Sequence, residues 1–135
     1  MVAYYPFAFS VEKPTILNNN YIAINNTGDL AANVEILYNL NTIASDVSIE
    51  LRSENDTTVI GQLNLNNITA EAGDTYILID SETQLIEGLD AGKNKTKHLY
   101  NRYITSGDFF WPPVGRSYLH SSVKFDRMSY IPMYY

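Results

Sequence analysis

The chain has 135 residues, of which 45% are apolar or aromatic and 18% are charged, and its net charge is −6. This length suits one domain, and the apolar fraction is high enough to exclude intrinsic disorder. Without cysteine there are no disulfides or thiolate sites, and no run reaches the roughly 20 apolar residues of a membrane span. Only two histidines, His98 and His120, are available for acid–base chemistry. Composition therefore favours a protein that is not an enzyme.

The charge is divided unevenly along the chain. Residues 1–90 hold thirteen acids and two bases, whereas residues 91–135 hold two acids and seven bases. One interpretation is that the two halves neutralise each other within a single fold. The other is a head-to-tail assembly in which a positive face docks on a negative neighbour. Binding to nucleic acid is not expected, because an acidic chain repels the phosphate backbone.

The first residues are predicted to lie outside the main domain. We expect residues 1–17 to form a lead-in or remnant arm and residues 18–135 to form one β-sandwich domain. The first ten residues, MVAYYPFAFS, lack a basic segment and contain Pro6, so they do not resemble a secretory signal. The segment 25–29, Asn-Asn-Thr-Gly-Asp, is predicted to be a turn, because Asn and Gly tolerate the positive φ that tight turns need.

Short alternating segments follow at intervals of about ten residues. Apolar and polar side chains alternate as in half-buried strands, and no long segment shows helical spacing. The segments are 21–26, 32–40, Val47–Arg52, Val59–Leu65, 75–79, 84–87, 99–104 as a strand or a single helical turn, and one or two strands within 123–135. Seven to nine short strands predict an all-β sandwich or barrel.

The phase of the alternation predicts the core. The near-continuous apolar run 76–79 indicates a strand buried on both faces. The predicted core residues are Val34, Ile36, Ile49, Leu51, Leu63, Tyr76, Leu78 and Phe125.

Acidic residues cluster between positions 74 and 90. Asp74, Asp80 and Glu82 could form the carboxylate pair of a glycosidase, and with Glu87 and Asp90 they could bind calcium. They lie in predicted turns, however, where Asp commonly bonds the backbone, and their spacing does not match an EF-hand. We therefore expect no catalytic residues, no metal and no cofactor.

An aromatic segment offers a candidate binding site. Trp111, Tyr100, Arg102 and Tyr103 supply ring faces and hydrogen-bonding groups of the kind that bind sugars. A lone Trp beside two phenylalanines and two prolines is also typical of a core plug or a subunit contact. Both interpretations stay open.

The charge split also predicts an assembly surface. The basic side is expected at Lys93, Lys95 and Lys97, in loop-like sequence, and the acidic side at Glu50, Glu54 and Asp56. Exposed pairs of this kind contribute only about 0–1 kcal/mol each, so aromatic burial would supply most of the affinity.

The order of motifs in residues 27–130 resembles the carboxy-terminal, galectin-like domain of the distal tail proteins of long-tailed, siphovirus-type bacteriophages. The most specific block is an Ala72-Gly73-Asp74 turn that leads into a strand ending Ile79-Asp80-Ser81. A Phe-rich segment ending in Pro-x-Gly, residues 109–115, and a terminal strand with aromatic and basic residues complete it. Ser117 departs from the family, which usually has Asn there.

The resemblance implies a galectin-like or jelly-roll-type β-sandwich of two antiparallel sheets. It also implies a structural role in a phage tail tip or baseplate, with assembly onto other tail proteins, a homo-oligomer in the particle, a contribution to host attachment and no catalysis. The protein would be made in the host cytoplasm and end in the virion. The alternative from the residues is a carbohydrate-binding module that recognises bacterial cell-wall glycans.

Overall fold

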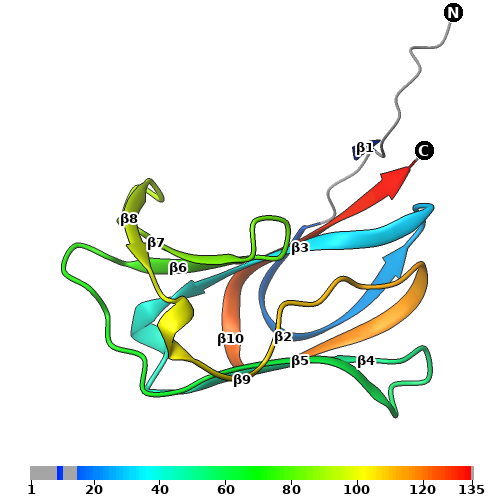
Figure 1. Cartoon of the computed structure of the whole chain (residues 1–135), viewed down its shortest axis with the longest axis horizontal. Helices are drawn as coiled ribbons and strands as arrows, with labels where there is room; N and C mark the ends of the chain where they lie inside the picture. Colours follow the sequence, from blue (N-terminus) through cyan, green and yellow to red (C-terminus); the bar gives the residue numbers. More distant parts are fainter. Residues whose placement is uncertain (1–8, 11–14, 135) are drawn as a thin grey trace, which may run out of the picture.

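The computed structural model describes residues 9–10 and 15–134, in which strands dominate and the only helices are two single 3-10 turns (Figure 1). The fold is therefore all-β, as predicted. The strands are β1 (Phe9–Ser10), β2 (Thr15–Asn26), β3 (Leu30–Asn39), β4 (Val47–Arg52), β5 (Val59–Leu65), β6 (Tyr76–Asp80), β7 (Leu85–Leu89), β8 (Lys95–Leu99), β9 (Ile104–Gly107) and β10 (Gly115–Tyr134). The 3-10 turns are η1 (Leu40–Thr42) and η2 (Asn101–Tyr103).

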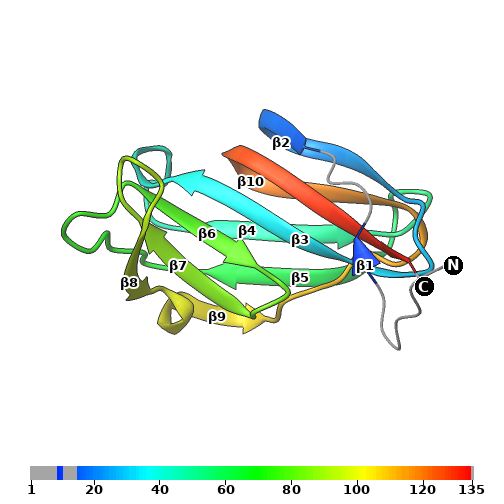
Figure 2. The ribbon, with the colours of Figure 1, turned by 90° about the horizontal axis from the view of Figure 1, so that it is seen from above.

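The strands form one antiparallel sheet that curls into two layers. Its order is β8-β7-β6-β3-β10-β4-β5-β9, with β1 and β2 also paired to β10. Figures 1 and 2 show β3, β6, β7 and β8 in one layer and β4, β5 and β9 in the other. The predicted sandwich is thus confirmed, but its two layers are one continuous sheet because β10 belongs to both.

The bend that joins the layers lies in β10. Its register with β2 shifts between His120 and Phe125; before the shift β10 pairs with β4, and after it with β3. Ser121 stabilises the bend, because its Oγ donates to the carbonyl of Val123 at 2.6 Å and lies 2.6 Å from the buried Tyr38 hydroxyl. A register shift of this kind means that one strand carries extra residues, which bend the strand and let it pass from one layer to the other.

The core lies between the layers. It contains six of the eight predicted residues, which are Val34, Ile36, Ile49, Leu51, Leu63 and Phe125. Tyr76 and Leu78 were predicted wrongly: they are half-buried on the outer face of β6, while Ile77 and Ile79 face the core. Four consecutive apolar residues carry no period, so the sequence could not indicate which pair points inward.

The start of the chain takes part in the sheet. β2 begins at Thr15, so it crosses the predicted boundary between residues 17 and 18. β1 and β2 pair in succession with the far end of β10, from Tyr134 down to Ser129. Residues 1–8 and 11–14 of the predicted lead-in lie outside the described part of the chain.

Candidate binding surfaces

An open groove of about 670 Å³ lies where the loop 108–114 crosses the start of β5. We call it the Trp111 groove; it is lined by Leu51, Ile60, Gly61, Gln62, Asp108, Phe109, Phe110, Trp111 and Pro113. Gly61 allows the loop to lie close to β5, because a Cβ there would be 2.8 Å from the Cβ of Phe110. The carbonyl of Pro112 accepts from Asn26 Nδ2 at 3.2 Å and from the Ala32 N–H at 2.8 Å. These bonds hold the loop, so the groove is preformed.

The Trp111 groove combines apolar and polar groups. The Trp111 side chain is 39% exposed, and Ile60 beside it is 47% exposed. Asp108 and Gln62 add an exposed carboxylate and an exposed amide to the same groove. Val59 and Val114, both about half exposed, extend the apolar surface along the chain. A ring face next to polar groups can stack on a sugar ring or receive an apolar side chain of another protein.

The other residues of the predicted sugar site lie elsewhere. Tyr100 is fully buried and offers no face to a ligand. Arg102 pairs with Glu71 and lies over the ring of Tyr103, 4.7 Å from its centroid. These residues adjoin the far end of β5, where the Asn66 N–H bonds the carbonyl of Tyr103 at 3.0 Å. The structure therefore does not bring them together with Trp111.

A buried carboxylate organises the end of the sheet formed by β6, β7 and β8. The Asp74 side chain is fully buried; it accepts hydrogen bonds from Thr96 Oγ1 at 2.5 Å and Tyr100 Oη at 2.6 Å, and it lies 3.1 Å from His98 Nδ1. Burial alone would raise the pKa of Asp74, but the hydrogen bonds from Thr96, Tyr100 and His98 outweigh it and hold the pKa below its ordinary value. Burial and the bond to Asp74 raise the pKa of Tyr100.

The Asp74 cluster is arranged for stability and not for nucleophilic catalysis. Thr96 Oγ1 donates its proton to the carboxylate and touches the same ring nitrogen of His98 that faces Asp74, so no hydroxyl is aligned with a free base. Two other acids of this stretch bind turn backbone: Asp80 accepts from the Glu82 N–H, and Asp90 from the N–H groups of Gly92 and Asn94, all at 2.9 Å.

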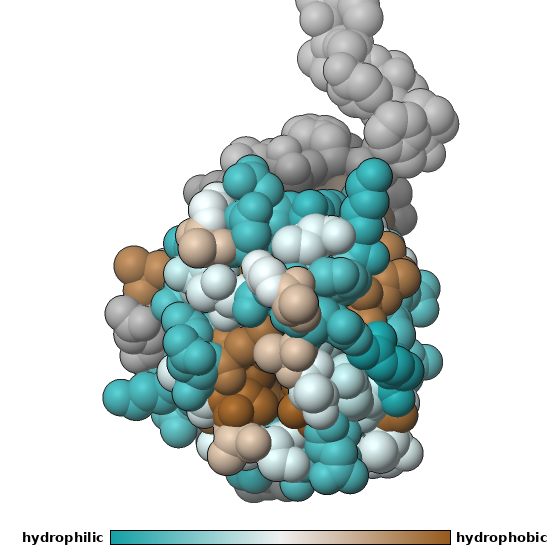
Figure 3. Space-filling view, turned by 90° about the vertical axis from the view of Figure 1, so that its left-hand side faces the viewer, coloured by the Kyte–Doolittle hydropathy of each residue, from teal (hydrophilic) through white to brown (hydrophobic). Residues whose placement is uncertain are grey.

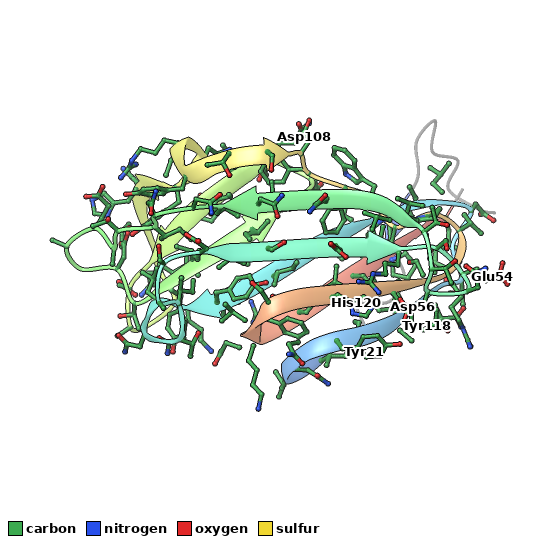
Figure 4. The ribbon with its side chains drawn as sticks, turned by 90° about the horizontal axis from the view of Figure 1, so that it is seen from below. Tyr21, Glu54, Asp56, Asp108, Tyr118 and His120 are labelled. Carbon is green, nitrogen blue, oxygen red and sulfur yellow. The ribbon has the colours of Figure 1, made fainter. Side chains whose placement is uncertain are left out.

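A second surface lies on the outer face of β2 and β10 (Figure 4). Tyr21 stacks on Tyr118, with ring centroids 6.0 Å apart, and meets the edge of His120 at 4.6 Å. His120 Nε2 lies 2.7 Å from Oδ1 of Asp56 in the β4–β5 turn. Partial burial and the nearby charge of Asp56 raise the pKa of Tyr21. The sequence did not indicate this cluster, because Tyr21, Asp56 and His120 come from three segments that are far apart in the chain.

The predicted assembly residues lie at opposite ends of the molecule. The β7–β8 turn carries Lys93, and Figure 1 places it far from the β4–β5 turn with Glu54. Lys95 pairs with Glu87 at 3.2 Å, Lys93 lies 5.5 Å from the centre of the Tyr76 ring, and Lys97 is exposed. At the acidic side, Glu50 pairs with Arg52 at 3.0 Å and Asp56 with His120.

Some charges of the two halves pair inside the fold. Two ion pairs join a base of residues 91–135 to an acid of residues 1–90, Lys95–Glu87 and Arg102–Glu71. Two further contacts join a histidine to an aspartate of the other half, His98–Asp74 and His120–Asp56. These contacts agree with the first interpretation of the charge split, and the second, a head-to-tail assembly, stays a prediction.

Figure 3 faces the end with η1, η2 and β8 and shows apolar surface in a hollow among hydrophilic side chains. Half-buried Leu40, Ile43 and Ile68 pack against the core.

The described residues contain no group of three or more acids or histidines that could hold a metal ion, and no helix among them is long and apolar enough to cross a membrane.

Comparisons with known proteins identify the fold. No family model and no curated protein matches the sequence. A solved structure matches: the crystal structure of SPP1 Dit (gp 19.1), titled "a Paradigm of Hub Adsorption Apparatus in Gram-positive Infecting Phages". The TM-score is 0.62 at 13% sequence identity, over 93% of this chain and 48% of that chain. This chain thus spans about half the length of that protein and shares its fold, which is like that of a distal tail protein.

Proposed function

We propose that the chain is a structural component of a phage tail tip or baseplate, similar to distal tail proteins, and that it is not an enzyme. The observation that carries the proposal is the match of 93% of this chain to SPP1 Dit at a TM-score of 0.62. The order of motifs in the sequence points to the same family independently of the backbone. In the virion the chain would assemble with other tail proteins and occur in more than one copy.

The test is to locate the chain in a particle. Virions of a phage that encodes it would be labelled with an antibody to the chain and imaged, and a phage with an amber codon in its gene would be grown without suppression. We expect label at the tail tip and particles with missing or unfinished tails in the amber mutant. Label on the capsid, or normal tails without the chain, would overturn the proposal.

A contribution to host attachment is the second part of the proposal, and the Trp111 groove supports it. An exposed indole beside Asp108 and Gln62 can bind a cell-wall sugar, which is also the basis of the alternative function as a carbohydrate-binding module. Binding of the purified chain to host cell walls should fall at least tenfold in Trp111→Ala. Leu99→Ala is the control, because Leu99 is similarly exposed, at 43%, on β8. Equal binding by both variants would leave assembly as the role of the groove.

A further inference from the structure

The Trp111 groove holds two polar side chains that are available to a ligand. Gln62 and Asp108 are neighbours, because the Asp108 N–H donates to the carbonyl of Gln62 at 2.9 Å. Both side chains are exposed, and Figure 4 shows Asp108 just beyond β9, pointing away from the strands. Oδ1 of Asp108 accepts from the Phe109 N–H at 2.7 Å, which fixes the carboxylate. Within the described part of the chain, no other hydrogen bond reaches the Asp108 carboxylate or the Gln62 amide.

The second surface, formed by Tyr21, Tyr118 and His120, differs in this respect. Its imidazole and its carboxylate already contact each other, with His120 Nε2 2.7 Å from Oδ1 of Asp56. A ligand that used these groups would compete with that contact, whereas a ligand in the Trp111 groove displaces only water from Asp108 and Gln62. Of the two aromatic surfaces, the Trp111 groove is therefore the better site for a polar ligand.

The available polar groups restrict what can occupy the groove. An apolar side chain of another protein would remove water from the Asp108 carboxylate and the Gln62 amide without replacing their hydrogen bonds, which costs free energy. The occupant therefore carries hydrogen-bonding groups beside a face that stacks on the Trp111 ring. An anion is disfavoured, because Asp108 is the only charged residue among the described residues that line the groove. A neutral sugar meets these conditions.

The lining is complementary to an acetamido group in particular. Such a group has an N–H donor, a carbonyl acceptor and a methyl group. The Asp108 carboxylate can accept from the N–H, and the Gln62 amide can donate to the carbonyl. Ile60, which is 47% exposed in the same groove, offers the methyl group an apolar contact. A hydroxyl in the same place would make no use of Ile60.

We propose that the Trp111 groove binds an N-acetylhexosamine unit of a glycan, with the sugar ring on the indole and the acetamido group between Asp108 and Gln62. An N–H that donates to an ionised carboxylate makes a charge-assisted bond, which is stronger than a neutral one. The acetamido group therefore supplies selectivity, and stacking on Trp111 supplies affinity for sugar rings in general. The biological source of the glycan, the host cell wall, rests on the proposed role in host attachment.

The first test uses the fluorescence of the full chain, in which Trp111 is the only tryptophan. The chain would be titrated with the tetramer of N-acetylglucosamine and with the tetramer of glucose of the same linkage, which has a hydroxyl in place of each acetamido group. We expect a saturable change in Trp111 emission and a dissociation constant at least tenfold lower for the N-acetylglucosamine tetramer. Equal dissociation constants, or no saturable change with that tetramer, would overturn the proposal.

The second test is Asp108→Asn. The oxygen of the new amide can still accept from the Phe109 N–H, so the loop should keep its conformation and the melting temperature should not change. The dissociation constant for the N-acetylglucosamine tetramer should rise at least fivefold, because the charge-assisted bond is lost. Asp56→Asn makes the same change on the second surface and should leave the dissociation constant unaltered. A loss of affinity in Asp56→Asn alone would assign the sugar to the second surface and overturn the proposal.

The outcome is separable from the test of the tail function. Label at the tail tip together with equal dissociation constants for the two tetramers would overturn the assignment of the sugar and leave the tail function standing. Selective binding together with label on the capsid would overturn the tail function and support the sugar site.

Discussion

Two aspartate–histidine pairs connect distant parts of this fold, and they differ in burial more than in distance. Asp56 and His120 lie 2.7 Å apart, with both side chains about 30% exposed. Asp74 and His98 lie 3.1 Å apart, but Asp74 is fully buried and also binds Thr96 and Tyr100. We therefore expect Asp74 to contribute more to the stability of the fold than Asp56, although its contact with histidine is the longer one. A buried carboxylate depends on all of its protein partners, whereas an exposed carboxylate is also solvated by water.

The largest effect is expected from Asp74→Ala. Loss of the carboxylate leaves Thr96, Tyr100 and His98 without their common acceptor in a buried site, which should lower the free energy of unfolding by about 3–5 kcal/mol. Urea denaturation measures this change. Asp56→Ala is the matched control, and a loss of equal size in the two variants would contradict the comparison.

Gly88→Ala tests how closely the backbone of β7 fits the buried carboxylate. A Cβ at Gly88 would lie 2.2 Å from Asp74 Oδ2, so the variant should lose about 1–3 kcal/mol of stability. In the double variant with Asp74→Ala the clash is gone, and the combined loss should be smaller than the sum of the two. Gly92→Ala, whose nearest neighbour would be the Asn94 side chain at 3.0 Å, is the control. Additive losses would show that Gly88 acts independently of Asp74.

Acid should weaken the Asp74 cluster. The ordinary pKa of an Asp side chain is about 3.9, and the folded-state pKa of Asp74 lies below this ordinary value. The ionised carboxylate therefore stabilises the fold at pH values above about 3.9. This contribution is lost as the pH falls through the folded-state pKa. Stability of the wild type should therefore approach that of Asp74→Asn below about pH 4, as measured by urea denaturation from pH 7 to pH 2. A constant difference between the two proteins across this range would show that the carboxylate does not titrate with folding.

The sequence predicted elements where alternation is strict. The bounds of β4, Val47–Arg52, and β5, Val59–Leu65, agree with the prediction to the residue. Apolar and polar side chains alternate throughout β4, and in β5 they alternate from Gln62 to Leu65. The first half of β10 was missed because Ser117 and Ser121 face inward, and buried serines do not produce an apolar period.

The Asp74 cluster could not be predicted, because its members come from two segments that are distant in sequence: Asp74 in a turn, and its partners within residues 96–100. Asp74 lies 22 residues from Thr96 and 26 from Tyr100, and its position after Ala72-Gly73 is that of an ordinary turn residue. The sequence did identify Trp111 as exceptional. It could not tell that Tyr100 would be buried, since an aromatic residue before a short 3-10 turn suits either a surface or a core.

The smallest effect is expected for the exposed pair. A double-mutant cycle with Asp56→Ala and His120→Ala should give a coupling energy of about 0.2–1 kcal/mol, because water solvates both groups when they separate. The same cycle on Asp74 and His98 should give a larger coupling energy, because the Asp74 side chain is shielded from solvent. Coupling energies of equal size in the two cycles would show that burial does not separate the two pairs.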